Sequence, residues 1–366
     1  MSTVTDNIDS SPVRALVVDD TVIYRRIVSD VLQEIPGVEV VGTAVNGRIA
    51  LEKIIELHPD FITLDVEMPE LNGVQVLQEI KQRGLTTSVI MLSAANSSSA
   101  ARTTEALALG AFDFVLKPSG ASPQDNLVQL REKLSPRVEA LITKRGKRRP
   151  SAPVAERRAP ASVIRHEPVR PGAATMVAIG VSTGGPEALN RLLPKLPGDL
   201  AAPVLIVQHM PPMFTKSLAD DLNKRCALQV EEATDGQPIR PGMALIAPGG
   251  RQMKIVQEDN QYLVRLTDDP PECACRPSVD YLFRSVSQLC PQSALAVIMT
   301  GMGTDGTLGI RLLKRKGAAV IAQNKETCVV FGMPAVAVAE GLADEVLPLE
   351  EIASHIVARV GRRTSP

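Results

Sequence analysis

Short apolar runs alternate with stretches of helical spacing along the first 135 residues. Each run is short enough for a buried strand. The stretch 74–82 between two runs places Val74, Leu77 and Ile80 on one helical face. Such alternation predicts a parallel sheet with helices on both faces. We expect a flavodoxin-like, five-stranded sheet of order 2-1-3-4-5. The predicted strands are 14–18, 38–42, 61–64, 88–92 and 112–116.

The same alternation of apolar runs and helical spacing resumes at residue 176 and predicts a second α/β domain. Two segments, 252–257 and 262–266, alternate apolar and polar residues and are typical of an antiparallel hairpin. We therefore expect a doubly wound, mostly parallel sheet with a hairpin beside it. The predicted parallel strands are 176–181, 204–208, 243–247, 294–300 and 318–322, and a last helix covers 350–360.

Apolar periodicity is lost between the two halves. Residues 144–172 hold nine lysines or arginines, two acids and five prolines. This composition is typical of a basic, proline-rich linker. We predict a first domain at 13–135, a linker at 136–173 and a second domain at 174–362.

Composition narrows the class of protein. With 44% hydrophobic residues, 22% charged residues and a net charge of -1, the chain is typical of a globular protein without a polyanionic partner. Aromatic residues make up only 2%, which disfavours a base-stacking surface. The five cysteines lack paired metal-binding spacing and indicate reduced thiols. We expect a cytoplasmic protein that neither inserts into membranes nor binds nucleic acid, because no apolar run is long enough to span a bilayer and no secretory signal opens the chain.

Polar residues cluster at the carboxyl ends of the first set of predicted strands. Asp19 and Asp20 follow the first strand, Asp65 follows the third, Ser93 the fourth and Lys117 the fifth. Ligands of such sheets bind at this edge. Converging carboxylates repel one another unless a cation joins them, and carboxylate oxygens suit Mg²⁺. A single aspartate could merely cap a helix, but the whole set favours a cation site.

These residues, with Met68-Pro69, Gly73 and Pro118, resemble the motifs of response-regulator receiver domains. The resemblance implies that Asp65 accepts a phosphoryl group from a sensor histidine kinase. It implies that Asp19, Asp20 and Asp65 hold Mg²⁺. The switch residues that it implies are Ser93, Phe114 and Lys117.

The stretch 176–186 carries the most distinctive chemistry of the second half. An apolar run is followed by small residues, and Pro186 is suited to the first turn of a helix. Residues 180–184 read G-x-S-x-G, a sharp turn that presents Ser182 as a nucleophile. A glycine-rich loop before a helix can equally bind phosphate, so this stretch alone leaves both interpretations open.

A nucleophilic serine requires a base, and histidine is the usual one. Of four histidines, only His209 follows a predicted strand in the domain that contains Ser182. Asp305, in a glycine-rich loop after another strand, is placed to orient the imidazole. It could also cap the helix that begins near Gly306. The order Ser, His, Asp excludes the α/β-hydrolase fold, whose order is Ser, Asp or Glu, His.

Six segments resemble the catalytic domain of chemotaxis protein-glutamate methylesterases, the CheB family. One departure is Val181, where alanine is usual. The segments are 180–185, 207–211, 247–251, 276–280, 299–306 and 330–334.

This resemblance implies hydrolysis of glutamate methyl esters on the cytoplasmic helices of methyl-accepting chemoreceptors, with release of methanol, and deamidation of certain glutamines. It implies Ser182 as nucleophile, His209 as base and Asp305 as its orienting acid. Thr183 would position the imidazole, and the Met302 backbone N–H would stabilise the oxyanion. No cofactor is expected for the hydrolytic step.

Regulation and two other classes of function follow from the same residues. If the unphosphorylated first domain covers the edge that carries Ser182, phosphorylation at Asp65 would uncover it by a population shift. Alternatively, the serine loop binds a ligand without turnover in a phosphorylation-controlled adaptor. A third hypothesis is a response regulator that binds DNA through the basic linker.

Overall fold

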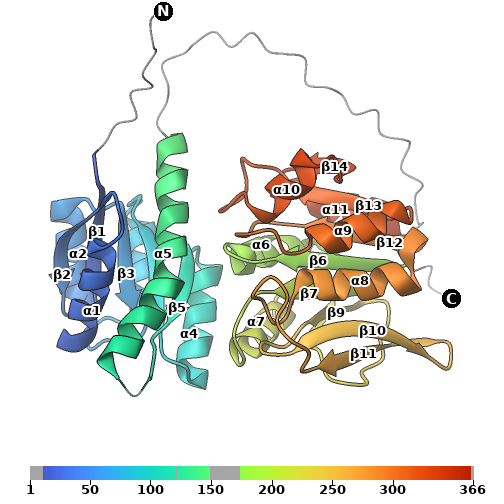
Figure 1. The fold of residues 1–366 in the computed structure, drawn as a ribbon, viewed down its shortest axis with the longest axis horizontal. Helices are drawn as coiled ribbons and strands as arrows, with labels where there is room; N and C mark the ends of the chain where they lie inside the picture. The colour runs from blue at the N-terminus through green and yellow to red at the C-terminus, as the bar shows by residue number, and fades with distance from the viewer. Residues whose placement is uncertain (1–10, 121, 149–173, 364–366) are drawn as a thin grey trace, which may run out of the picture. The chain divides into compact units, whose positions relative to one another are not determined.

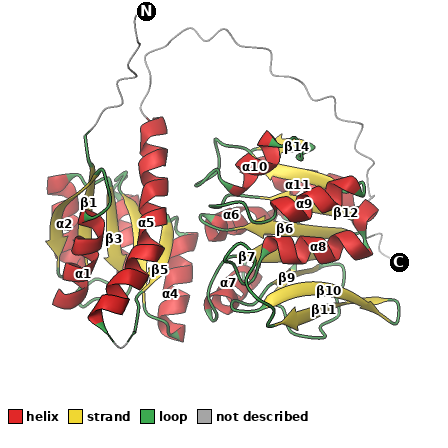
Figure 2. Ribbon diagram, in the orientation of Figure 1, coloured by secondary structure: helices red, strands yellow, loops and turns green. Residues whose placement is uncertain are grey.

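The computed structural model describes residues 11–120, 122–148 and 174–363. They form two compact units, each of which is described by itself (Figure 1). Both units contain a central sheet covered by helices (Figure 2). In these described ranges, no helix combines the length and the apolar character needed to cross a bilayer.

The first unit is a five-stranded parallel sheet of order β2-β1-β3-β4-β5, which confirms the predicted order. Its strands are β1 (Val13–Val18), β2 (Val38–Ala44), β3 (Phe61–Asp65), β4 (Ser88–Ser93) and β5 (Asp113–Leu116). Its helices are α1 (Val22–Gln33), α2 (Gly47–Leu57), α3 (Gly73–Gln82), α4 (Ser97–Ala108) and α5 (Pro123–Arg148).

Strand β1 lies between β2 and β3, so the chain changes direction across the sheet at β1 and β3. Loops leaving neighbouring strands at such a point diverge and leave a crevice. Asp19 follows β1 and Asp65 ends β3, which brings both carboxylates to this crevice. The two carboxylates therefore lie at the strand ends where the sequence pattern predicted them, beside the direction change.

Helix α5 continues well past the predicted domain end at 135. Residues 136–148, predicted to be linker, are helical instead. The helix continues because it has an apolar face to bury: Leu134, Val138 and Leu141 are spaced along one side of the helix and are buried. The helix packs against α1 and β5 and contains Pro136. The remainder of the predicted linker and the amino-terminal residues 1–10 lie outside the described residues.

The second unit is a seven-stranded sheet of order β14-β13-β12-β6-β7-β9-β8, with every strand pair parallel. The edge strands β8 and β14 were not predicted. The strands are β6 (Met176–Val181), β7 (Val204–Gln208), β8 (Gln229–Glu232), β9 (Met243–Ile246), β12 (Ala294–Ile298), β13 (Ala319–Gln323) and β14 (Glu345–Leu347). The helices are α6 (Gly185–Leu192), α7 (Phe214–Asn223), α8 (Val279–Leu289), α9 (Thr307–Arg315), α10 (Met333–Ala339) and α11 (Leu349–Val360).

The predicted hairpin forms a separate two-stranded antiparallel sheet, β10 (Gln252–Glu258) and β11 (Gln261–Thr267). Helix α8 packs against β10 on one side and against β6 and β12 on the other. In Figure 1, α8 and α9 lie side by side over the main sheet. Met176 and Ala178 of β6 join the buried cluster with these helices, and the alternate residues Val177 and Ile179 are also fully buried. The sheet is therefore covered on both faces, as in a doubly wound fold.

Strand β6 occupies the direction change of this second sheet, between β7 and β12. Val181 pairs with Gln208, and Gly180 pairs with Ile298. The residues that follow these three strands consequently meet at one edge. Glycine is required at 180 because a Cβ there would lie 2.4 Å from Val279 Cγ1. This close approach brings the amino-terminal end of α8 to the same edge.

Candidate active site

Ser182 is held in a tight turn between β6 and α6. Its amide donates to the Thr300 carbonyl at 3.0 Å, and its carbonyl accepts from the Gly185 amide at 2.8 Å and from Gln208 Nε2 at 3.0 Å. Gly184 has φ +77°, a left-handed conformation that favours glycine. The turn leaves Ser182 partly exposed at the start of α6.

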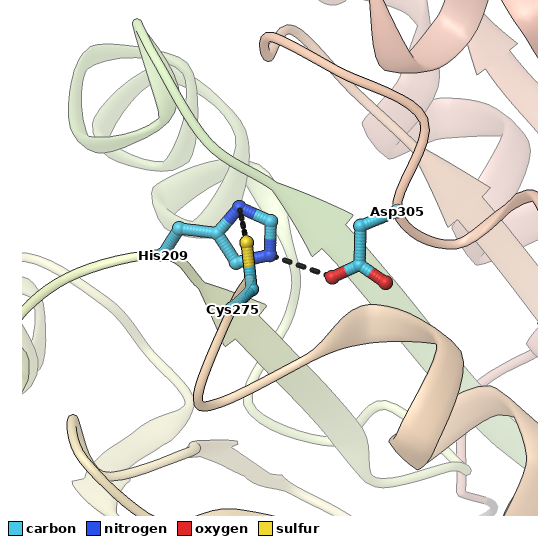
Figure 3. A group of neighbouring side chains, drawn as sticks. All are labelled: His209, Cys275 and Asp305. Atoms are coloured by element: carbon cyan, nitrogen blue, oxygen red, sulfur yellow. Dashed lines mark hydrogen bonds and ion pairs between the residues drawn. The ribbon is translucent and has the colours of Figure 1, made fainter. Parts of the chain in front are cut away.

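His209 follows β7 on the neighbouring strand. Its amide donates to the Val181 carbonyl at 3.3 Å. Because Val181 and Gln208 are register partners, Ser182 and His209 stand one position beyond them on strands that are about 4.8 Å apart. The His209 side chain is 13% exposed, and its Nε2 lies 2.8 Å from Asp305 Oδ2 (Figure 3).

Asp305 is almost fully buried and is surrounded by hydrogen-bond donors. Oδ1 accepts from Ser278 Oγ at 2.9 Å and from the Asp280 amide at 3.0 Å, and Oδ2 accepts from the Val279 amide at 2.7 Å. Asp305 therefore caps α8. The alternative that Asp305 caps the following helix is wrong, because its carboxylate bonds to His209 and to the start of α8. The Gly309 amide of α9 donates to Asp280 instead. Sequence distance concealed the cap on α8, since α8 precedes Asp305 by many residues.

His209 and Asp305 each change the pKa of the other. Burial disfavours the imidazolium of His209, but hydrogen bonds to Asp305 and Cys275, with their negative charge, outweigh it and raise its pKa to about 9. Burial likewise disfavours the Asp305 carboxylate, but the hydrogen bond and charge of His209 lower its pKa overall. Asp305 is thus an ionised acceptor that orients His209 through Nε2.

Cys275 is the residue that sequence reasoning missed. Its Sγ lies 3.6 Å from His209 Nδ1 (Figure 3). One donor atom each from His209, Cys275 and Asp305 lie within 4.8 Å of one another. It precedes α8 in a loop, so no strand-end argument selected it. The available signal was its position immediately before the Arg-Pro-Ser-Val-Asp motif at 276–280.

The ring nitrogen that remains for a nucleophile is Nδ1, because Nε2 is bonded to Asp305. Among the residues that the structure describes, Nδ1 has Cys275 Sγ as its hydrogen-bond partner rather than Ser182 Oγ. His209 and Asp305 are therefore joined directly, whereas Ser182 lies beside them and, within the described ranges, makes no hydrogen bond to the ring. The assignment of all three to catalysis stays a prediction.

Thr183 and Met302 belong to two turns that are tied together. The Thr183 carbonyl accepts from Thr300 Oγ1 at 2.9 Å. Gly301, directly before Met302, accepts from the amides of Gly332 and Met333 at 3.1 and 2.9 Å. A Cβ on Gly301 would lie 2.8 Å from Ser182 Cβ, so the Met302 loop runs close to the Ser182 turn. This proximity is compatible with the predicted supporting roles.

The first unit brings together Asp19, Asp65 and Lys117. Lys117 Nζ lies 2.7 Å from Asp19 Oδ2 and 2.7 Å from Asp65 Oδ2. Burial raises the pKa of Asp65 to about 6, although the nearby Lys117 opposes that shift. One carboxylate oxygen from each of Asp19, Asp20 and Asp65 lies within 4.8 Å of the others. This set of hard oxygen ligands fits Mg²⁺, whose charge would offset the cost of burying the carboxylates.

Ser93 and Phe114 lie on the neighbouring strands. Ser93 is fully buried and its Oγ accepts from Thr103 Oγ1 at 2.8 Å. Phe114 is 6% exposed. The structure thus locates both residues within the first unit, and their role as switch residues stays a prediction.

Comparison with known proteins gives a consistent result for both units. Residues 15–129 match the response regulator receiver domain, and residues 177–356 match the CheB methylesterase domain. The chain is 50% identical to the protein-glutamate methylesterase/protein-glutamine glutaminase of Desulfotalea psychrophila, over 95% of this chain and 98% of that protein. It is 44% identical to the protein of the same description from Bacillus subtilis, over 95% and 98%.

A solved structure extends the similarity to the fold of the second unit. The catalytic domain of CheB methylesterase from Thermotoga maritima is 42% identical and has a TM-score of 0.50. The match covers 50% of this chain and 97% of that domain. The similarity therefore includes nearly all of that catalytic domain.

Proposed function

Since the chain belongs to the CheB methylesterase family, we propose that it hydrolyses glutamate methyl esters on chemoreceptor helices and releases methanol. The observation that carries the proposal is the pairing of His209 with Asp305 beside Ser182. All three residues lie at the edge of the second sheet where the chain changes direction. The same chemistry would deamidate glutamine, because an amide carbonyl accepts the same nucleophile. The two relatives described above bear both activities in their names.

The acylation half begins with Ser182 Oγ attacking the ester carbonyl carbon. His209 accepts the serine proton at Nδ1, while Nε2–H donates to Asp305. The carboxylate stabilises the imidazolium that forms. His209 then returns the proton to the departing methoxide, so methanol leaves and glutamyl-serine remains.

The second half regenerates the enzyme. Water attacks the glutamyl-serine carbonyl and His209 accepts its proton, after which Ser182 leaves and takes the proton back. The sum is ester plus water to carboxylic acid plus methanol. The backbone N–H of Met302 is the proposed oxyanion donor, and Thr183 supports the imidazole position. One such donor is typically worth about 3 kcal/mol of barrier.

Control of this activity is assigned to the first unit. Asp65 would accept a phosphoryl group from the sensor histidine kinase of the chemotaxis system, with Asp19, Asp20 and Asp65 holding Mg²⁺. When bound, Mg²⁺ neutralises charge on the phosphoryl oxygens. Lys117, which already contacts Asp19 and Asp65, would pair with a phosphoryl oxygen instead. We place the reaction in the cytoplasm, where such kinases and receptor helices meet.

Methanol release from a methylated chemoreceptor tests the proposal. The full chain should release methanol, and a small-molecule phosphodonor with Mg²⁺ should increase the rate. Ser182→Ala serves as the inactive control. No release from a receptor with confirmed methyl groups would refute the esterase assignment and favour an adaptor without turnover.

A further inference from the structure

We infer that His209 and Cys275 form a binding site for Zn²⁺ and that the bound ion blocks the active site. The proposed hydrolysis does not use Cys275, although its thiol lies against the imidazole that the reaction needs. Binding of the ion is independent of the proposed function, whereas inhibition rests on it.

The two donor atoms have the chemistry and spacing of zinc ligands. Thiolate sulfur and imidazole nitrogen are the ligands that Zn²⁺ prefers. Cys275 Sγ and His209 Nδ1 are 3.6 Å apart. For a zinc ion about 2.1 Å from the nitrogen and about 2.3 Å from the sulfur, that separation corresponds to an N–Zn–S angle of roughly 110°. This is close to the tetrahedral angle.

Asp305 supplies the outer partner that zinc-binding histidines usually have. It holds Nε2 at 2.8 Å and leaves Nδ1 for the metal. A carboxylate in this position fixes the ring orientation and increases the basicity of the ligating nitrogen. Asp305 is itself fixed by Ser278 and by the first amides of α8. The imidazole is therefore oriented before any ion arrives.

The cysteine is also positioned by its backbone. The Cys275 amide donates to the Glu272 carbonyl at 2.8 Å, and the Glu272 amide donates back at 3.1 Å. The carbonyl of Cys275 also accepts from Gln252 Nε2 at 3.4 Å. Both Cys275 and His209 are partly exposed, so an ion can reach them from solvent.

Zinc at Nδ1 would occupy the atom that must accept the serine proton. The base would be lost, and hydrolysis would stop until the ion left. Inhibition should therefore be reversed by a chelator.

A neighbouring thiol provides the matched control. Cys273 is exposed, and its Sγ lies 3.9 Å from Asp280 Oδ2 rather than against His209. One atom each from Cys273, Asp280 and Asp305 also lie within 4.8 Å of one another. A metal on that side of Asp305 would depend on Cys273 and would be independent of Cys275.

The test uses Co²⁺ as a spectroscopic substitute for Zn²⁺ on the full chain after removal of bound metal. Thiolate ligation gives a charge-transfer absorption that carboxylate ligands, such as those of the first unit, do not give. Wild type, Ser182→Ala and Cys273→Ser should show the band, and Zn²⁺ should displace it. Cys275→Ser and His209→Gln should bind Co²⁺ at least about tenfold more weakly, because each removes a ligand and the loss of an outer partner alone typically costs that much. A band retained in Cys275→Ser, or lost in Cys273→Ser, would overturn the site.

Methanol release tests the inhibition. Zn²⁺ should inhibit wild type and Cys273→Ser at concentrations that leave Cys275→Ser active, each measured relative to its own uninhibited rate. Equal sensitivity of Cys275→Ser would refute the inhibitory role. If wild type without zinc releases no methanol, the proposed function fails, while the absorption experiment still decides the metal site.

Discussion

Asp280 and Asp305 cap each other's helices. Asp305, in the loop before α9, accepts from the first two amides of α8, and Asp280, in the first turn of α8, accepts from the Gly309 amide of α9 at 2.7 Å. Buried carboxylates at helix amino termini satisfy amides that would otherwise lack partners. The exchange fixes α8 and α9 against one another and holds the carboxylate that orients His209.

The exchange also carries an electrostatic cost. Burial, and then the charge of Asp305, raise the pKa of Asp280 to about 6 against the Gly309 hydrogen bond. Between about pH 4 and 6 the folded state therefore binds more protons than the unfolded state, and stability falls as pH rises.

Asp280→Asn should remove that fall, because asparagine keeps an acceptor for Gly309 without the charge. The variant should gain on the order of 2 kcal/mol relative to wild type between pH 4 and pH 7. Denaturant unfolding at both pH values measures it, with Asp220→Asn, on the exposed face of α7, as control. An equal change in the free energy of unfolding between the two pH values for Asp280→Asn and wild type would contradict the expected role.

Ser182→Ala and Cys275→Ala together identify the nucleophile. Removal of Ser182 Oγ should lower turnover by roughly four to six orders of magnitude, because no acyl-enzyme can form. Removal of the Cys275 thiol should change turnover by less than about tenfold. Methanol release measures both. The reverse result would assign the attack to Cys275, which is the group in contact with Nδ1.

The pH dependence of kcat/KM should follow His209. A base must be neutral to accept a proton, and the pKa of His209 is raised to about 9. Activity should therefore rise with pH up to about 9. In Asp305→Asn, the loss of the acidic partner should move the inflection towards the ordinary histidine value near 6.5 and lower the rate by about 10³ to 10⁴.

Cys275→Ala should also lower the inflection, because the Cys275 hydrogen bond contributes to the raised pKa. NMR titration of the His209 ring provides a readout that does not depend on turnover. An inflection that is unchanged in both variants would show that these contacts do not set the pKa.

Phosphorylation of the first unit should require both Asp65 and a divalent cation. With acetyl phosphate and Mg²⁺, wild type should incorporate one labile phosphoryl group, while Asp65→Asn should incorporate none. Removal of the metal with EDTA should abolish incorporation, because Asp19 and Asp20 would have no ion to place. Retarded migration in a phosphate-binding gel measures it. Incorporation by Asp65→Asn at the wild-type rate would refute the assignment.

The sequence by itself determined most of the architecture. Apolar runs alternating with helical spacing specify parallel α/β sheets, since a strand buried on both faces must be apolar throughout. The ends of these strands then located Asp19, Asp65 and Lys117 at one edge, and Ser182 and His209 at another. The strands and the residues at their ends could be predicted because the spacing of apolar residues is a local property of the sequence. The extent of α5 was missed because basic residues and Pro136 masked the buried face carried by Val138 and Leu141.

Only the tertiary structure decided which atoms of the site meet. It placed Asp305 on Nε2 of His209 and on the first amides of α8, rather than on its own helix α9. It also brought Cys275 to Nδ1, from a loop that no strand end predicts. Both contacts join segments far apart in the chain, and both involve α8 or the loop before it, the helix whose first residue lies against Gly180. A local sequence pattern cannot predict these interatomic distances. They depend on how the helices pack on the sheet, and not on the residues that neighbour each side chain in the sequence.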